Sequence, residues 1–455
     1  MTAFEQVNWL ATGVTSVVLV AALWRERHLL LKPSIVVLLV FHVRIQWAAA
    51  IQSSTIEAYL PAPWDFALLA QGFPVLGLLL ALGTWREESR AVWRRVTSPP
   101  VVASGRRLTM MLVLSVGILS VVGLFLSIMP WRSTGLYAIL FDPASAADAR
   151  AAFSLGGLSR SPLRYSYHVM ANVLAPLLAA MIAMDWAALR RRREIARGAI
   201  GLATVALLVV VVSFSGARSY SAMIVLTVLW TVYLQRGLPV NPVGLLIGGV
   251  AVLALPTVLS VLREGLTVDL VVLWDHLVHG IFNRVFVAPM ETGLWHVHFA
   301  QTQAPVGWAG IPKIAALLDR PAVNMPNLIA AQYAPGGGGE TGGANTSFVF
   351  SYYSYFGQAS FPLSLVGLWA LDAVFVVYRR LSDHLLLPCV VATSVASTSL
   401  VNAEYTVVLV TNGLAVAPVV ALVLESLVPG GGGRVAAARA SPWSPGRRAT
   451  ARGGT

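Results

Sequence analysis

Apolar residues along this chain form long uninterrupted blocks, which polar connections separate. Most blocks are close to the roughly 20 residues that a helix needs to cross the hydrocarbon core of a bilayer. Eleven blocks are expected to span a membrane: 8–24, 34–53, 64–84, 108–129, 165–187, 198–214, 219–235, 243–261, 361–378, 385–402 and 406–427. The pattern predicts an all-α polytopic membrane protein with about 11 transmembrane helices, between 10 and 12, because two of the blocks are short.

Three polar connections are longer than the others. Segment 86–107 is expected on the cytoplasmic side, and 130–164 and 262–361 are expected outside. A connection of roughly 100 residues is too long for a simple loop. Its many aromatic side chains indicate a folded segment, and its polar spacing predicts amphipathic or interfacial helices at 270–282 and 285–299.

Two segments have compositions of their own. The glycine-rich run 336–343 predicts a hinge, because glycine loses the most conformational freedom on ordering. The tail 429–455 is rich in Gly, Pro, Ala and Arg, with little to bury, and is expected to be disordered, basic and cytoplasmic. Residues 1–428 are therefore expected to form a single transmembrane domain that includes the large outer loop 262–361.

Composition and charge support a membrane location. Hydrophobic residues make up 57% of the chain and charged residues 11%, against roughly 25% charged residues in soluble domains. The net charge of +12 would suit a nucleic-acid partner, but most of the 32 lysines and arginines lie on connections of one side. By the positive-inside rule that side is cytoplasmic, which places the N-terminus outside and the C-terminus inside. We therefore expect no nucleic-acid partner.

Arginines gather on the side that is expected to face outward. They are Arg160, Arg164, Arg218, Arg263, Arg284 and Arg320. Arginine binds phosphate through two parallel hydrogen bonds and keeps its charge, so these side chains are candidate phosphate ligands, although basic residues also simply anchor helix ends. Arg218 stands out because it follows a tight Ser-Gly-Ala turn between two short helices, close to membrane depth.

Arg44 lies in the middle of the predicted span 34–53. A charged side chain at that depth is costly and generally functional. Two interpretations remain open: Arg44 binds substrate, or it snorkels to the outer interface beside Gln46.

Carboxylates and histidines accompany the arginines in the outer loop. Glu291, Asp275 and His296 are the candidate proton acceptors, since burial can tune such groups toward neutral pKa values. The alternative is that they are solvated residues on amphipathic helices. The spacing of His276, His279 and Asp275 matches no compact zinc signature, so no metal and no other cofactor is expected. A phosphate loop is also absent from the sequence, which argues against ATP-driven transport.

Two segments of the outer loop carry a resemblance to a known family. Asn-Arg-Val-Phe-Val-Ala-Pro at 283–289 resembles the Arg-aromatic-x-x-Pro stretch that opens the large outer loop of bacterial O-antigen polymerases, the oligosaccharide repeat-unit polymerases. Ala-Asn-Thr-Ser-Phe at 344–348, followed by an aromatic-rich stretch and Gly357, is similar to the segment that leads back into the membrane. The likeness covers roughly 160–430, and the Arg-x10-Gly pattern of some members is absent.

The resemblance implies a substrate, a location and partners. The substrate would be a polyprenyl-diphosphate-linked oligosaccharide in membrane lipid, polymerised at the outer face of the bacterial cytoplasmic membrane without a metal. A flippase and a chain-length regulator would be the partner proteins. Arg218, Arg284 and Asn345 match the family locally as substrate ligands, whereas Arg263, Arg164 and Arg44 are chosen on chemistry alone. A polysaccharide ligase, or a transporter or flippase of lipid-linked glycans, is the alternative.

Overall fold

The computed structural model describes residues 1–98, 105–142, 145, 149, 162–188, 195–236, 257–258, 261, 269–334 and 344–428. Within these ranges the chain is helical and contains no strand. Seven helical stretches are long and apolar enough to cross a membrane: Ala3–Arg25, Pro33–Ile51, Pro63–Gly83, Gly105–Ile128, Pro162–Ala187, Phe348–Tyr378 and Asp383–Val401. The protein is therefore an all-α protein with the features of a membrane protein.

The remaining expected spans differ from the prediction in instructive ways. Segments 198–214 and 406–427 contain shorter apolar helices, Gly198–Val212 and Val416–Leu427. Segment 219–235 is a helix, Arg218–Arg236, and 243–261 lies largely outside the described residues. The segment expected at 361–378 begins earlier, at Phe348, because the aromatic stretch at the end of the outer loop is itself helical.

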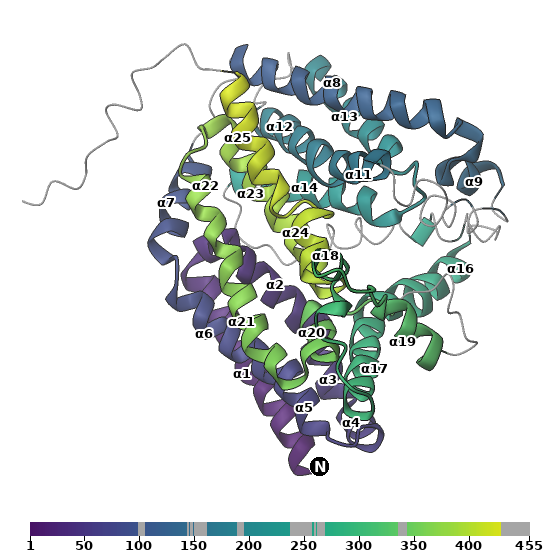
Figure 1. The fold of residues 1–455 in the computed structure, drawn as a ribbon. Helices are drawn as coiled ribbons and strands as arrows, with labels where there is room; N and C mark the ends of the chain where they lie inside the picture. The colour runs from purple at the N-terminus through teal and green to yellow at the C-terminus, as the bar shows by residue number, and fades with distance from the viewer. Residues whose placement is uncertain are drawn as a thin grey trace, which may run out of the picture.

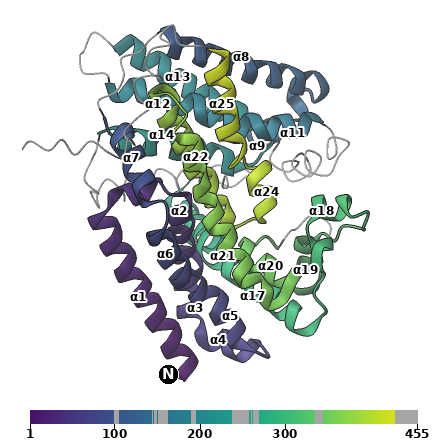
Figure 2. The ribbon, with the colours of Figure 1, turned by 60° about the vertical axis from the view of Figure 1, so that its left-hand side comes forward.

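The helices form two packed bundles, each with its own apolar core (Figure 1). The first bundle contains α1 (Ala3–Arg25), α2 (Pro33–Phe41), α3 (Trp47–Ile51), α4 (Ser53–Tyr59), α5 (Pro63–Ala67), α6 (Phe73–Gly83), α16 (Leu270–Asp275), α17 (Ala288–Thr302), α18 (Pro312–Leu317), α19 (Met325–Tyr333), α20 (Phe348–Phe356) and α21 (Ser360–Leu371). Its core includes stacked rings of Phe66 and Phe350 and tilted rings of Phe41 and Phe73. The outer-loop helices α17 and α20 thus share a core with the N-terminal helices, and they lie beside α3 and α5 in Figure 2.

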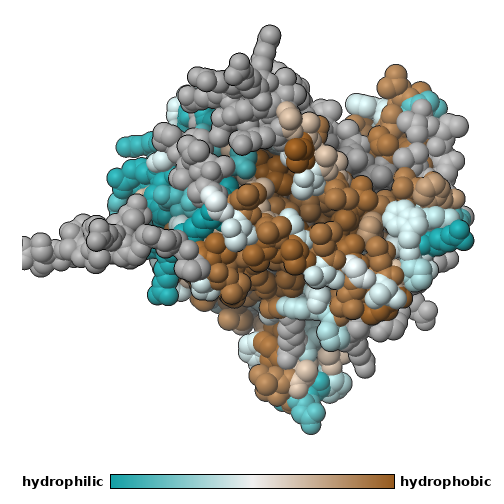
Figure 3. All heavy atoms as spheres, turned by 90° about the horizontal axis from the view of Figure 1, so that it is seen from above, coloured by the Kyte–Doolittle hydropathy of each residue, from teal (hydrophilic) through white to brown (hydrophobic). Residues whose placement is uncertain are grey.

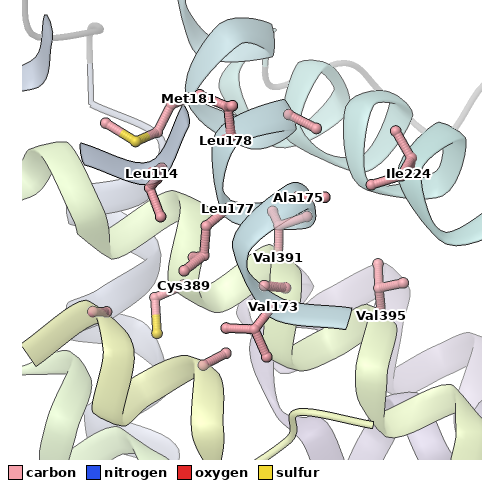
Figure 4. Packing of buried hydrophobic residues seen from close by; sticks show 14 of the residues in the cluster. Leu114, Val173, Ala175, Leu177, Leu178, Met181, Ile224, Cys389, Val391 and Val395 are labelled. Atoms are coloured by element: carbon pink, nitrogen blue, oxygen red, sulfur yellow. The ribbon is translucent and has the colours of Figure 1, made fainter. Parts of the chain in front are cut away.

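The second bundle lies above the first in Figure 1. It contains α7 (Arg86–Val96), α8 (Gly105–Ile128), α9 (Gly135–Phe141), α11 (Pro162–Val169), α12 (Ala175–Ala188), α13 (Ile195–Val212), α14 (Arg218–Arg236), α22 (Phe375–Tyr378), α23 (Asp383–Ser397) and α25 (Val416–Leu427). Helix α24 (Tyr405–Val410) packs in the core of the first bundle, through Val408. Figure 4 shows part of the centre of the second bundle, an apolar cluster to which α12, α14 and α23 contribute Leu177, Ile224 and Val391.

The surface of the second bundle is apolar along α8. Leu112 and Leu119 on α8 are both more than half exposed. Figure 3 shows a broad hydrophobic area on this face, with hydrophilic residues gathered beside it. Leucines turned away from the core in this way are what a helix in contact with lipid requires.

Ion pairs link the connections that are expected to face the cytoplasm. They join Arg86 to Glu26, Arg379 to Glu88 (2.6 Å), Arg95 to Asp383 (2.7 Å) and Arg106 to Glu425 (2.6 Å). Ser382 also donates to Glu425 (2.8 Å), which connects the last two pairs. These contacts bring together α7 and the inner ends of α1, α8, α22, α23 and α25.

Three membrane-spanning stretches contain a π-helical turn: η2 (His42–Gln46), η3 (Leu68–Gly72) and η6 (Met170–Leu174). Each turn places an amide side chain in the protein interior, where Gln46 is 0% exposed and Gln71 and Asn172 are each 2% exposed. A π turn accommodates one extra residue and disturbs the regular hydrogen-bond ladder. An unpaired polar group in the bilayer core costs several kcal/mol, and each of these amides is hydrogen-bonded to another segment.

The outer loop contains the helices expected at 270–282 and 285–299, with shifted boundaries. Helix α16 continues as a π-helical segment, η8 (His276–Val287), and α17 follows without a break. Helix α20 ends at Gly357, whose φ of 57° interrupts the helix before α21. The expected glycine hinge at 336–343 and the tail 429–455 lie outside the described residues.

Candidate functional site

The first turn of α17 is fixed against the segment that precedes α20. Thr346 donates a hydrogen bond to the carbonyl of Pro289 (3.0 Å), and Thr292 donates to the carbonyl of Asn345 (3.0 Å). The side chain of Asn345 is exposed beside this turn. The structure therefore places Asn345 next to the turn of α17 that carries Glu291.

His296 holds the same assembly from inside. Its Nδ1 lies 3.1 Å from the hydroxyl of Ser354, and its Nε2 lies 3.1 Å from the carbonyl of Ala344. The side chain is 0% exposed, and burial lowers the pKa of His296 to about 4 because the imidazolium would lose its hydration. A buried ring with both nitrogens occupied is well suited to hold α17 and α20 together, and this environment does not favour the expected role of proton acceptor.

Arg44 reaches the outer loop from within the membrane-spanning stretch. Its Nε donates a hydrogen bond to the carbonyl of Val285 on η8. The π turn η2 that carries Arg44 packs against both η8 and α17. Gln46 does not accompany Arg44, because it turns into the bundle interior. The sequence left open substrate binding and snorkelling beside Gln46; the structure shows a third arrangement, in which Arg44 contacts the outer loop.

The expected carboxylates are both at the surface. Glu291 is exposed in the first turn of α17, and its carboxylate makes no hydrogen bond to the described residues. Asp275 is exposed at the end of α16, with a 3.9 Å ion pair to exposed His279. An exposed pair of this kind contributes little to stability, so Asp275 and His279 are available to other partners.

A further outer-loop histidine, His298, lies on α17 two turns beyond Glu291. His298 Nδ1 is 3.0 Å from the hydroxyl of Tyr333, and its ring centroid is 5.0 Å from that of Tyr59. Burial raises the pKa of Tyr59, and the charges of Tyr333 and Glu291 raise it further. Positions 291 and 298 are seven apart, two turns along one helix face, and this spacing was the available sequence signal.

Arg164 and Arg218, two more of the expected arginines, belong to helices of the second bundle. Arg164 Nε lies 3.4 Å from His168 Nε2, one turn along α11, and His168 Nδ1 lies 2.6 Å from the hydroxyl of Tyr220 on α14. Arg218 is the first residue of α14. The side chains of Arg218 and Arg284 and all of Arg263 lie outside the described part of the chain.

The turn before Arg218 is closely packed. The backbone N–H of Ser215 donates to the hydroxyl of Tyr167 (3.2 Å), and Gly216 has a φ of 73°. Gly135 at the start of α9 packs directly on this turn, since a Cβ added at Gly135 would lie 2.6 Å from the backbone nitrogen of Gly216. The turn therefore has little freedom to move, which fixes where α14 and Arg218 begin.

In the described ranges, no group of three or more His, Cys, Asp and Glu side chains is arranged to hold a metal ion. No protein-family model, curated protein or solved structure matches the chain.

Proposed function

We propose that this protein is a membrane glycosyltransferase that polymerises polyprenyl-diphosphate-linked oligosaccharide repeat units at the outer face of the cytoplasmic membrane. The observation that carries the proposal is the contact between Arg44 and Val285. Through it, a cation from a membrane-spanning stretch meets the outer-loop segment that contains Arg284, beside the turn that carries Glu291. A lipid-linked diphosphate has its charge at this depth and its sugar outside it.

The proposed reaction is a displacement at the anomeric carbon of the donor. A sugar hydroxyl of a second lipid-linked repeat unit attacks that carbon, and its proton passes to the carboxylate of Glu291. The bond between the anomeric carbon and the diphosphate oxygen breaks, and polyprenyl diphosphate leaves with the electron pair. Charge grows on the leaving oxygens, so fixed guanidinium groups stabilise the transition state more than the bound substrate.

The surroundings of Glu291 suit an acceptor sugar. Tyr59 and Tyr333 supply aromatic faces with polar edges, and His298 lies between them. Among the described residues His298 Nε2 makes no hydrogen bond, which leaves it available to a sugar hydroxyl. Binding sites of this kind combine apolar rings with a few placed polar groups.

A reconstituted assay tests the proposal. Purified protein in liposomes would receive lipid-linked oligosaccharide, and products would be separated by gel electrophoresis. A ladder of polymers that disappears in Glu291→Gln and Arg44→Ala but persists in Arg320→Ala is the expected result. Arg320, the expected outer arginine that follows α18, is a suitable control because it is exposed and takes no part in the contacts of Arg44 and Glu291 described above. Transfer of a single unit to a different acceptor would indicate a ligase, and movement of lipid without transfer would indicate a flippase.

Cysteine labelling tests the orientation on which the reaction depends. In a Cys389→Ser background, an impermeant reagent should label Thr302→Cys in intact cells and spare Ser98→Cys. Both positions are exposed, so the reagent can reach each one from its own side. The opposite labelling pattern would place α17 in the cytoplasm and overturn the proposal.

A further inference from the structure

Two π turns of the first bundle lie side by side and exchange hydrogen bonds. Gln46 Nε2 on η2 donates to Gln71 Oε1 on η3 (2.8 Å). In return, Gln71 Nε2 donates to the backbone carbonyl of Gln46 (3.3 Å). The two irregular turns are thus bound to each other through fully buried amides.

Helix α1 and His42 complete the network. Thr12 donates to Gln71 Oε1 (3.0 Å), and Gln46 Nε2 donates to the hydroxyl of Thr15 (3.1 Å). Gln46 Oε1 lies 2.6 Å from His42 Nδ1, so both polar atoms of the Gln46 amide are engaged. Several hydrogen bonds therefore connect the π turn η2, which carries Gln46, to α1 and to η3.

Arg44 lies on this turn and points the other way, to Val285 of the outer loop. Successive residues of a helix are offset by about 100° around its axis, and a π turn adds one residue to the turn. If η2 relaxed to a regular α-helix, Arg44 would be displaced from η8 by an angle of that order. The direction of Arg44 therefore depends on whatever maintains the π turn.

We infer that the buried network of Gln46, Gln71 and Thr12 acts as a positioning device that holds Arg44 against the outer-loop helix η8. This inference rests on the proposed function only for the ligand that Arg44 binds. The network does not touch substrate. It acts by fixing the register of η2, which a diphosphate ligand needs because two-point recognition by arginine is sensitive to orientation.

The third π turn provides a matched comparison. Asn172 on η6 donates to the carbonyl of Thr411 (3.0 Å) and is as deeply buried as Gln71. It joins η6 of the second bundle to the end of α24, and neither segment carries Arg44 or Val285. Ordinary hydrogen bonding between membrane helices accounts for Asn172, so a substitution there reports the cost of losing a buried amide alone.

Disulfide cross-linking tests the inference without reference to activity. Cysteines at positions 44 and 285, in a Cys389→Ser background, report the approach of η2 to η8. We expect Gln71→Leu to lower the cross-linking rate severalfold and Asn172→Leu to leave it unchanged, with both variants folded by size-exclusion chromatography. If Gln71→Leu does not fold, Thr12→Val removes one hydrogen bond to Gln71 and serves instead. An unchanged rate in a folded network variant overturns the inference.

Activity then separates this inference from the proposed function. Gln71→Leu should lower kcat when Arg44 is present and add no further loss in Arg44→Ala, because residues that act through one another are not additive. Asn172→Leu should have the same effect in both backgrounds. Reduced cross-linking combined with normal polymer formation in Arg44→Ala supports the positioning role and overturns the proposed function.

Discussion

The arginines that are expected to face outward have different settings in the two bundles. In the first bundle, Arg44 comes from the middle of a membrane-spanning stretch, and an irregular turn with a buried network directs it to the outer loop. In the second, Arg164 and Arg218 stand at helix starts; a histidine one turn away contacts Arg164, and a tight turn fixes the backbone before Arg218. A buried cation held by distant contacts is costly and specific, whereas helix-end arginines are common anchors. We therefore expect the chemistry to depend more on the first bundle.

The largest expected effect is at Glu291. In the proposed mechanism the second bundle contributes no comparable exposed carboxylate. Glu291→Gln should slow turnover by about a hundredfold or more, as expected when a positioned proton acceptor is removed. Binding of lipid-linked oligosaccharide should change little. Single-turnover kinetics and a binding assay on the same preparation measure the two quantities. Normal turnover would remove Glu291 from the mechanism.

Arginine substitutions compare the bundles directly. Arg44→Ala should lower polymer formation by roughly ten- to a hundredfold, corresponding to a lost charge-assisted contact of about 1.5–3 kcal/mol. Arg44→Lys should recover little, because an ammonium lacks the planar fork of hydrogen-bond donors. Arg164→Ala should have a smaller effect than Arg44→Ala. If Arg164→Ala proved the more damaging, the order of importance drawn from the bundles would be reversed.

A glycine substitution tests how firmly the second bundle fixes its own turn. Gly135→Ala would place a Cβ 2.6 Å from the backbone of Gly216. Overpacking of this kind costs about 1–3 kcal/mol, so the melting temperature should fall. Gly123→Ala on α8 is the control, because its Cβ would meet nothing within 4 Å. Equal melting temperatures for the two variants would show that the turn can yield.

The pH dependence of stability tests the interior of the first bundle. The pKa of His296 is about 4 in the folded protein against 6.5 as its ordinary value. Between these values the unfolded chain binds more protons, so stability falls as pH decreases from 6.5 toward 4 and is unaffected by His296 above that range. Between pH 7 and pH 5 the loss should be roughly 2 kcal/mol. His296→Gln should flatten this part of the curve, and an unchanged slope would contradict the assignment.

The smallest expected effect is that of chelation. The outer-loop histidines and carboxylates form no metal-binding group in the described ranges, and the proposed mechanism uses arginines to neutralise the leaving group. Polymer formation should therefore survive dialysis against EDTA. Loss of activity that one specific cation restores would bring His276, His279 and Asp275 back as ligands.

The coarse architecture could be predicted from the sequence because apolar block length is a local property. Seven of the expected spans are present as long apolar helices, and the outer-loop helices are where periodicity placed them. The early start of the helical stretch at Phe348 was missed because aromatic residues suit both a docking face and a membrane helix. The positive φ of Gly357 marks the boundary between these two roles, and that conformation is known only from the structure.

The candidate site was predictable only in part, because its contacts join distant segments. No local pattern shows that Arg44 meets Val285, which is 241 positions away. His296 and His298 are two residues apart, and helix packing alone decides that His296 is buried while His298 faces Tyr59 and Tyr333. The π turn that separates Gln46 from Arg44 is likewise set by long-range hydrogen bonds to Gln71 and α1.

Native mass spectrometry of the purified protein with polyprenyl diphosphate tests the central claim most directly. The wild-type protein should retain the diphosphate lipid in preference to the monophosphate, because a diphosphate offers more charged oxygens to arginine. Arg44→Gln should lower this retention by about tenfold or more, in keeping with the loss of one charge-assisted contact. Arg320→Gln should bind as the wild type does. Equal retention of the diphosphate lipid by the wild-type protein and Arg44→Gln would contradict the account.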